Sequence, residues 1–135
     1  MNGYFAESRL KSANIPYRFC TNESQLSQKK IYDRLASLGI PLTVDQVFSP
    51  IPAAKKYVEK HDLRPYTIVH KDVGDEFKEF TKEKHHNCVL IGDATDNFSY
   101  DNVDEAFRIL LQHPTLLTMG YGYFSFHMIF LSNSL

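Results

Sequence analysis

Apolar residues recur along this chain with two kinds of spacing. Apolar positions three or four residues apart are typical of amphipathic helices, and short apolar runs between Gly, Pro or polar clusters are typical of buried strands. Because helices and strands alternate on this pattern, the predicted fold is α/β with parallel strands. The predicted helices cover residues 5–13, 25–38, 50–60, 72–80 (a short helix or turn) and 100–112, and the predicted strands cover residues 17–20, 47–48, 65–70, 87–92 and 115–119.

Two of the predicted helices carry clear signals. Ser24 is a favourable N-cap for the helix over residues 25–38, and Gly39 is a favourable stop after it. The helix over residues 100–112 is amphipathic. We expect five of its apolar side chains to face inward: Val103, Ala106, Phe107, Leu110 and Leu111.

The organisation of the chain changes near Arg64. Residues 1–62 contain few strands, and no strand precedes the first helix, although a doubly wound domain normally begins with one. Residues 63–122 form a compact βαβαβ pattern. Residues 123–135 form an apolar tail, of the kind we expect at an alternative or truncated end of a longer product.

Composition narrows the possible partners and compartment. The chain has 135 residues, the usual size of one domain, and a net charge of −1, so we expect neither a nucleic-acid nor a membrane partner. Its two cysteines, Cys20 and Cys88, both lie in strand-like runs, which favours buried, reduced thiols. With no evident signal peptide, we expect a protein of the cytoplasm or the nucleus.

The segment from Tyr17 to Ser24 is the best candidate site. A predicted strand ends there in Thr21, Asn22 and Glu23, and a helix is expected to follow. In α/β sheets ligands bind beyond the carboxyl ends of strands, and a helix N-terminus favours anions. The alternative is that these polar side chains only turn the chain and cap the helix.

The segment Arg18–Ser24 resembles the second motif of the haloacid dehalogenase superfamily of phosphatases. The likeness continues through Leu63–Tyr66, Asn87–Ile91 and Asn97–Asn102, and covers roughly residues 8–122. The resemblance implies a partial Rossmann-like core over residues 1–62, followed by an inserted α/β cap over residues 63–122.

The resemblance also implies a function. It indicates a magnesium-dependent phosphatase that hydrolyses phosphohistidine, phospholysine and inorganic pyrophosphate, so the partner would be a phosphorylated small molecule or phosphoprotein. Thr21 takes the position that holds the phosphoryl group, and Asn22 and Glu23 shape its loop. Asp93 lies in a cap loop that faces the substrate in the family, which makes it a candidate for specificity. The alternative is a loop carboxylate without such a role.

Other parts of the family's site have no match in this sequence. The family attacks phosphorus with the first Asp of an Asp-x-Asp motif, and a Lys and further acidic residues hold charge and magnesium. Here no Asp-x-Asp precedes Thr21, and no Lys or carboxylate follows Glu105. The magnesium ligands are therefore not found, and we expect this chain to be inactive on its own. The alternative function is that of a binding or dimerisation partner, with a homodimer as one such assembly.

One further segment resembles a metal motif. Ile91–Asp96 contains Gly-Asp followed by a second Asp, but Asn97–Tyr100 matches the cap loop instead. The six histidines show no metal-ligand spacing on one helix face. We therefore predict no metal site within the chain.

Overall fold

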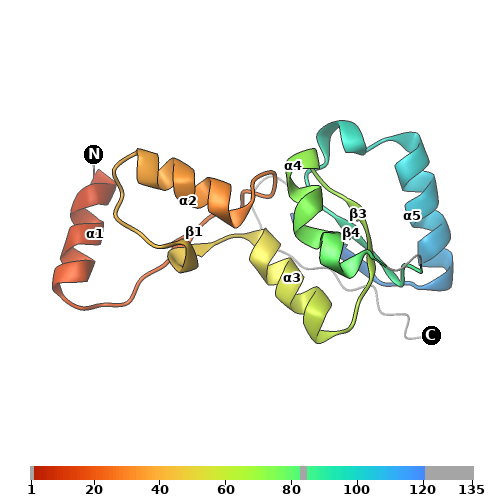
Figure 1. The fold of residues 1–135 in the computed structure, drawn as a ribbon, viewed down its shortest axis with the longest axis horizontal. Helices are drawn as coiled ribbons and strands as arrows, with labels where there is room; N and C mark the ends of the chain where they lie inside the picture. The colour runs from red at the N-terminus through yellow and green to blue at the C-terminus, as the bar shows by residue number, and fades with distance from the viewer. Residues whose placement is uncertain (1, 83–84, 121–135) are drawn as a thin grey trace.

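The computed structural model describes residues 2–82 and 85–120, and the predicted apolar tail over residues 123–135 lies outside them. Within the described residues the chain forms two units, each built on its own parallel sheet (Figure 1). The first unit contains α1 (Asn2–Ser12), β1 (Phe19–Cys20), α2 (Gln28–Ser37), the 3-10 turn η1 (Val44–Gln46) and β2 (Val47–Phe48). The second contains α3 (Pro50–Lys60), β3 (Pro65–Ile68), α4 (Lys71–Gly74), the 3-10 turn η2 (Asp75–Phe80), β4 (Cys88–Ile91), the 3-10 turn η3 (Thr95–Asn97), α5 (Tyr100–Gln112) and β5 (Leu116–Thr118). The predicted α/β class and the alternation of helices with parallel strands are confirmed.

The sheet of the first unit has two short parallel strands. Phe19 lies opposite Val47, and Cys20 lies opposite Phe48. The predicted stop of α2 is confirmed, because Gly39 takes a φ of 79° and its N–H donates to the carbonyl of Ala36. Glycine adopts this left-handed conformation without the steric cost that a side chain brings.

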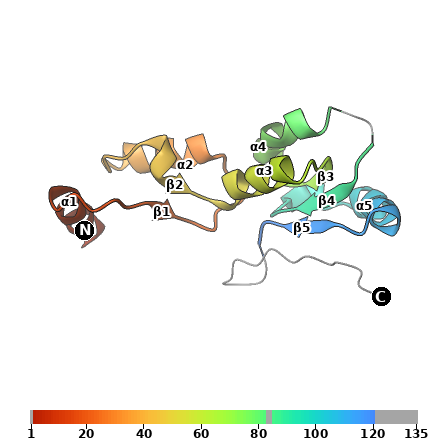
Figure 2. The same cartoon turned by 90° about the horizontal axis from the view of Figure 1, so that it is seen from below.

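The sheet of the second unit has three parallel strands in the order β3-β4-β5. Helices cover both of its faces, with α3 and α4 on one side (Figure 2). Successive strand side chains point to opposite faces. On β4, Leu90 packs in the cluster with α3, whereas Val89 packs in the cluster with α5.

The helix α3 packs with the second unit. Its buried residues Ile51, Ala54 and Val58 share a hydrophobic cluster with Phe77 and Leu90 of the second unit. The predicted boundary at residue 62 assigns α3 to the first unit, but its packing places it on the second sheet. By packing, the first unit therefore ends near Ser49.

Three asparagines from the segments that resemble the family tie the second unit together. The side chain of Asn87 accepts from the N–H of Arg64 at 2.7 Å, which links the starts of β3 and β4. Asn97 donates to the carbonyl of Val69, and Asn102 accepts from the hydroxyl of Tyr66. Burial raises the pKa of that hydroxyl, with a smaller contribution from Glu105. These asparagines therefore have structural roles.

The prediction that both cysteines are buried is wrong for Cys20. Cys88 is fully buried, and burial raises the pKa of its thiol to about 12. Cys20 is exposed, because among the described residues β1 has only β2 beside it. A strand needs neighbours on its edges and faces to bury its side chains, and β1 has few of them.

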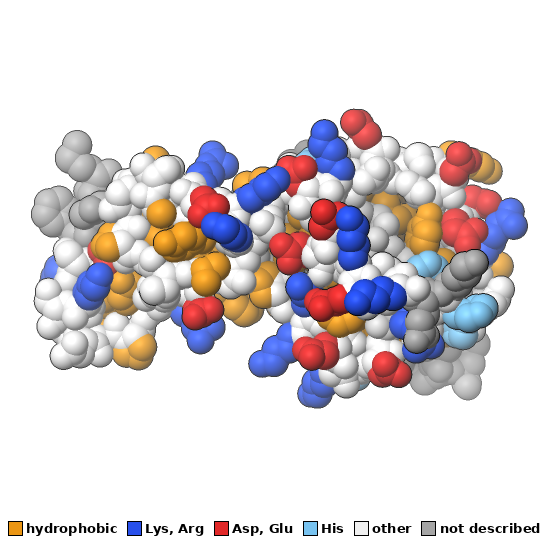
Figure 3. Space-filling model, viewed as in Figure 1, with side chains coloured by type: hydrophobic (Ala, Val, Ile, Leu, Met, Phe, Trp, Pro, Cys, Tyr) orange, Lys and Arg blue, Asp and Glu red, His pale blue; other side chains and the backbone are white. Residues whose placement is uncertain are grey.

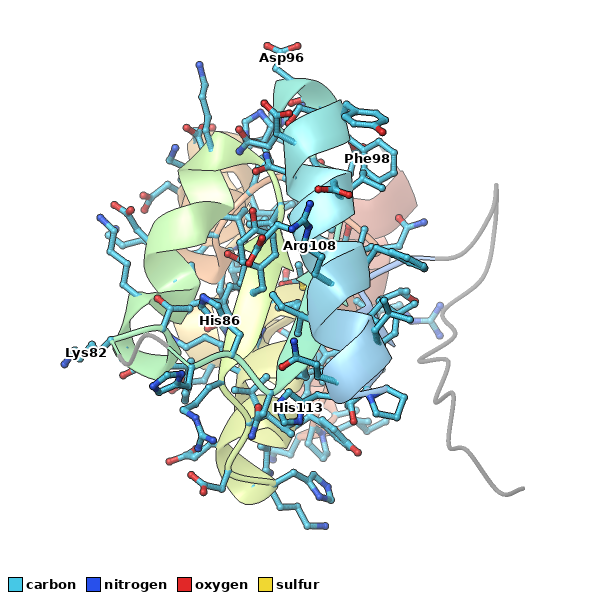
Figure 4. All side chains as sticks on the ribbon, turned by 90° about the vertical axis from the view of Figure 1, so that its right-hand side faces the viewer. Lys82, His86, Asp96, Phe98, Arg108 and His113 are labelled. Atoms are coloured by element: carbon cyan, nitrogen blue, oxygen red, sulfur yellow. The ribbon has the colours of Figure 1, made fainter. Side chains whose placement is uncertain are left out.

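The predicted inward face of α5 is wrong for three residues. Ala106 is buried and Leu110 is partly buried, but Val103, Phe107 and Leu111 are exposed by 39%, 60% and 71%. The cause is geometric: Ala106, Ile109 and Leu110 already cover the narrow three-stranded sheet. The rest of the apolar arc of α5 is turned outward. In Figure 4, Phe98 also projects outward beside the first turns of α5.

Among the described residues, no helix has both the length and the apolar character that a membrane span requires.

Candidate functional site

Thr21 lies directly after β1, at the carboxyl end of a parallel strand. Its backbone N–H donates to the carbonyl of Phe48 at 3.0 Å, which extends the pairing with β2. Its hydroxyl oxygen accepts from the N–H of Glu23 at 3.1 Å. That contact uses the oxygen as an acceptor, so the hydroxyl proton is free to donate to another group. The geometry suits a ligand with acceptor oxygens.

The loop after Thr21 is a series of turns and not the first turn of a helix. Glu23 accepts from the N–H of Gln25 at 2.7 Å, just as Thr21 accepts from Glu23. Such side-chain bonds to nearby N–H groups compete with helix formation. The prediction that Ser24 caps the helix is therefore wrong: the N-cap is Ser27, whose hydroxyl accepts from the N–H of Lys30 at 3.2 Å.

The other predicted loop residue, Asn22, is exposed, and Ser24 is buried. Because α2 begins at Gln28 instead of residue 25, its positive N-terminus lies farther along the chain from Thr21 than the sequence suggests.

Asp93 from the second unit meets the Thr21 loop. It lies after β4, and its Oδ2 accepts from the side-chain amide of Gln25 at 2.6 Å. Thr21, Glu23, Gln25 and Asp93 are therefore joined by three successive hydrogen bonds. The structure brings three of the four predicted site residues together and leaves Asn22 outside this chain of contacts.

A second contact joins the two units nearby. Lys30, in the first turn of α2, pairs with Asp72 at 2.8 Å between Nζ and Oδ2. The hydrogen bond from Lys30 is the main cause of the lowered pKa of the Asp72 carboxyl. No sequence motif marks Gln25, Lys30 or Asp72. Gln25 lies 68 residues from its partner Asp93, and Lys30 lies 42 residues from its partner Asp72.

A hollow of about 250 Å³ lies along α2 and β1 next to the loop. Thr21 and Glu23 line it together with apolar side chains of Phe19, Leu26 and Leu35. Figure 3 shows hydrophobic side chains at the surface of this unit. Most of the lining is apolar, so the hollow can accept apolar groups beside the polar loop.

The carboxylates near the Thr21 loop do not form a cluster among the described residues. Magnesium is bound through several oxygen ligands in near-octahedral geometry. No three His, Cys, Asp or Glu side chains gather as a metal site within residues 2–82 and 85–120. The Asp93 carboxylate is engaged by Gln25, and Asp96 projects away from the molecule in Figure 4.

Cys88 is not suited to act as a nucleophile. Its raised pKa keeps the thiol protonated at neutral pH, and a protonated thiol is a poor nucleophile.

The sequence matches a known protein family. Residues 6–83, more than half of the chain, match the family model described as haloacid dehalogenase-like hydrolase. The chain belongs to the haloacid dehalogenase-like hydrolase family.

Individual relatives carry a more specific name. The phospholysine phosphohistidine inorganic pyrophosphate phosphatases of Xenopus laevis and Homo sapiens are 42% and 40% identical over 119 residues. Each match covers 87% of this chain and 44% of the relative. The chain thus spans less than half the length of these relatives.

Solved structures agree on the fold. The crystal structure of 4-nitrophenylphosphatase from Thermotoga maritima matches with a TM-score of 0.76 at 18% identity, over 88% of this chain and 48% of that one. A thermostable NPPase double mutant from Geobacillus stearothermophilus matches with a TM-score of 0.72 at 25% identity, over 84% of this chain and 47% of that one. The partial, mixed α/β architecture is therefore that of haloacid dehalogenase-like phosphatases.

Proposed function

We propose that this chain carries the phosphoryl-binding loop and cap of a phosphatase that acts on phosphohistidine, phospholysine or inorganic pyrophosphate. The position of Thr21 is the strongest support for this function. Its hydroxyl follows a parallel strand, has its proton free, and lies in a loop that touches the second unit. The names of the relatives support the class of substrate.

The proposed roles follow from the contacts. Thr21 donates its hydroxyl proton to a phosphoryl oxygen, while the bond from the Glu23 N–H fixes the hydroxyl oxygen. Glu23 shapes the loop through the Gln25 N–H, and Asn22 presents an exposed amide beside it. Asp93 supplies negative charge from the cap side.

We propose further that the 135-residue chain binds phosphoryl groups without hydrolysing them. Phosphoryl transfer in this family needs a nucleophilic carboxylate, and no Asp-x-Asp precedes Thr21 in this sequence. Loss of one catalytic group alone lowers turnover by several orders of magnitude.

Phosphate release from pyrophosphate tests this directly. With magnesium present, the purified chain is expected to release no more phosphate than its Thr21→Ala variant. Release that disappears in Thr21→Ala would contradict the proposal, because a carboxylate of this chain, Asp93 first, would then have to act as the nucleophile.

A second candidate function is self-association through α5. The exposed apolar stripe, defined as Phe98, Tyr100, Val103, Phe107 and Leu111, runs along one side of this helix. Exposed apolar patches of this kind mark interaction surfaces. The distribution of charges along α5 favours a second copy of the chain as the partner. Asp101, Asp104 and Glu105 lie in the first half of α5, whereas Arg108, which pairs with Asp104 at 3.0 Å in the same helix, lies in its second half. Two antiparallel copies therefore bring the carboxylates of one helix near the arginine of the other.

Sedimentation velocity over a range of concentrations tests the dimer. We expect a dimer that is lost in Phe107→Ser/Leu111→Ser. The matched control is Leu38→Ser on α2, because Leu38 is 68% exposed and Leu111 is 71% exposed. A chain that stays monomeric at every concentration, or a control that dissociates equally, would rule out the stripe as the interface.

A further inference from the structure

Two polar bridges span the gap between the two units, and both start from the beginning of α2. Gln25, three residues before the helix, donates to Asp93 at 2.6 Å. Lys30, in the first turn, pairs with Asp72 at 2.8 Å. Within the described residues, the chain crosses between the units once, at Ser49 between β2 and α3 (Figure 2).

We propose that Gln25 and Lys30 are positioning residues, which together latch the second unit over Thr21. The consequence for substrate binding rests on the function proposed above for Thr21, but the latch itself does not.

The placement of the partners explains how two contacts suffice. Asp72 follows β3 and Asp93 follows β4, and these two strands are direct neighbours in the sheet. The carboxyl ends of neighbouring parallel strands lie at one edge of a sheet, about 5 Å apart. The two bridges therefore hold one sheet edge at two points, which restrains both the approach and the tilt of the second unit.

The path from the latch to the site is short. Gln25 uses its backbone N–H to hold Glu23 and its side chain to hold Asp93. Glu23 in turn holds the hydroxyl oxygen of Thr21 through its own N–H. Movement of Asp93 is therefore transmitted to the orientation of the Thr21 hydroxyl through Gln25.

The Lys30–Asp72 ion pair is weak enough to break and form again. The Lys30 and Asp72 side chains are 52% and 36% exposed. Exposed ion pairs are weak, and salt weakens them further. Loss of this pair is expected to shift the equilibrium between closed and open units by about two- to fivefold. The latch can thus open to admit and release a ligand.

The neighbouring residue Lys29 provides a matched control. Lys29 pairs with Asp33 at 3.0 Å, and both residues belong to α2. Charge reversal at Lys29 therefore changes the net charge of α2 as reversal at Lys30 does, without removing a contact between the units.

Distances between two spin labels test the latch without any ligand. The labels are attached at Ala36→Cys in α2 and Gln112→Cys in α5, both at exposed positions, in a Cys20→Ser background. Cys88 is buried and stays unlabelled. Lys30→Asp is expected to broaden the distance distribution, Lys30→Asp/Asp72→Lys to restore it, and Lys29→Asp to leave it unchanged.

Several outcomes would overturn the proposal. A Lys30→Asp distribution equal to that of the parent protein would show that the bridge does not hold the units, and a charge swap that fails to restore the distance would show that the pair is not its basis. Inorganic phosphate binding is measured separately on the same variants. Failure of Thr21 to bind phosphate leaves the distance result intact, so the two proposals fail independently.

Discussion

Replacing Phe77 with alanine is expected to lower the free energy of unfolding of the second unit by about 3–5 kcal/mol, the usual cost of removing a buried phenylalanine. Phe77 is fully buried and packs in the cluster that joins α3 to the sheet, with Val58 and Leu90 among its members. Small domains are stable by only about 5–15 kcal/mol. The substitution is therefore expected to remove a large share of the stability and loosen α3 from the sheet.

Urea denaturation followed by circular dichroism measures this effect. Leu38→Ala is the control, because Leu38 is 68% exposed, lies outside the apolar stripe, and its loss is expected to change stability by less than about 1 kcal/mol. Equal and small effects for both variants would contradict the assignment of Phe77 to the centre of the core.

Much of the fold was predictable from local patterns. The predicted starts of α3 at residue 50 and of α5 at residue 100 agree with the structure, and Gly39 ends α2 as predicted. These signals depend only on neighbouring residues. The parallel pairing follows from the alternation of helices and strands.

Features that depend on distant partners were not predictable. Cys20 is exposed because few elements surround β1, and Phe107 is exposed because the sheet beneath α5 is narrow. A single-sequence pattern shows that a residue is apolar but does not show how much surface is available to cover it. The bond from Gln25 to Asp93 joins residues 68 positions apart, which no local pattern can reveal.

The candidate site was predicted in part. Thr21 and Glu23 were found from their place after a strand, and Asp93 from the resemblance of its loop. The start of α2 was misplaced, because the side chains of Thr21 and Glu23 take up the backbone N–H groups that a helix beginning at residue 25 would present.

Replacing Thr21 with valine is expected to weaken binding of inorganic phosphate by about tenfold or more. A hydrogen bond to a charged group contributes about 1.5–3 kcal/mol, and valine keeps the shape of threonine while removing the hydroxyl. The same change removes the acceptor for the Glu23 N–H. Thr21→Ser retains the hydroxyl and is expected to bind within about threefold of the parent chain.

Titration with inorganic phosphate, followed by NMR of the backbone amides, measures directly whether Thr21 holds a phosphoryl group. We expect chemical-shift changes at the amides of Glu23 and Gln25 that are lost in Thr21→Val and kept in Thr21→Ser. Amides of this loop that do not respond to phosphate, or a valine variant that binds as tightly as the parent chain, would contradict this role of Thr21.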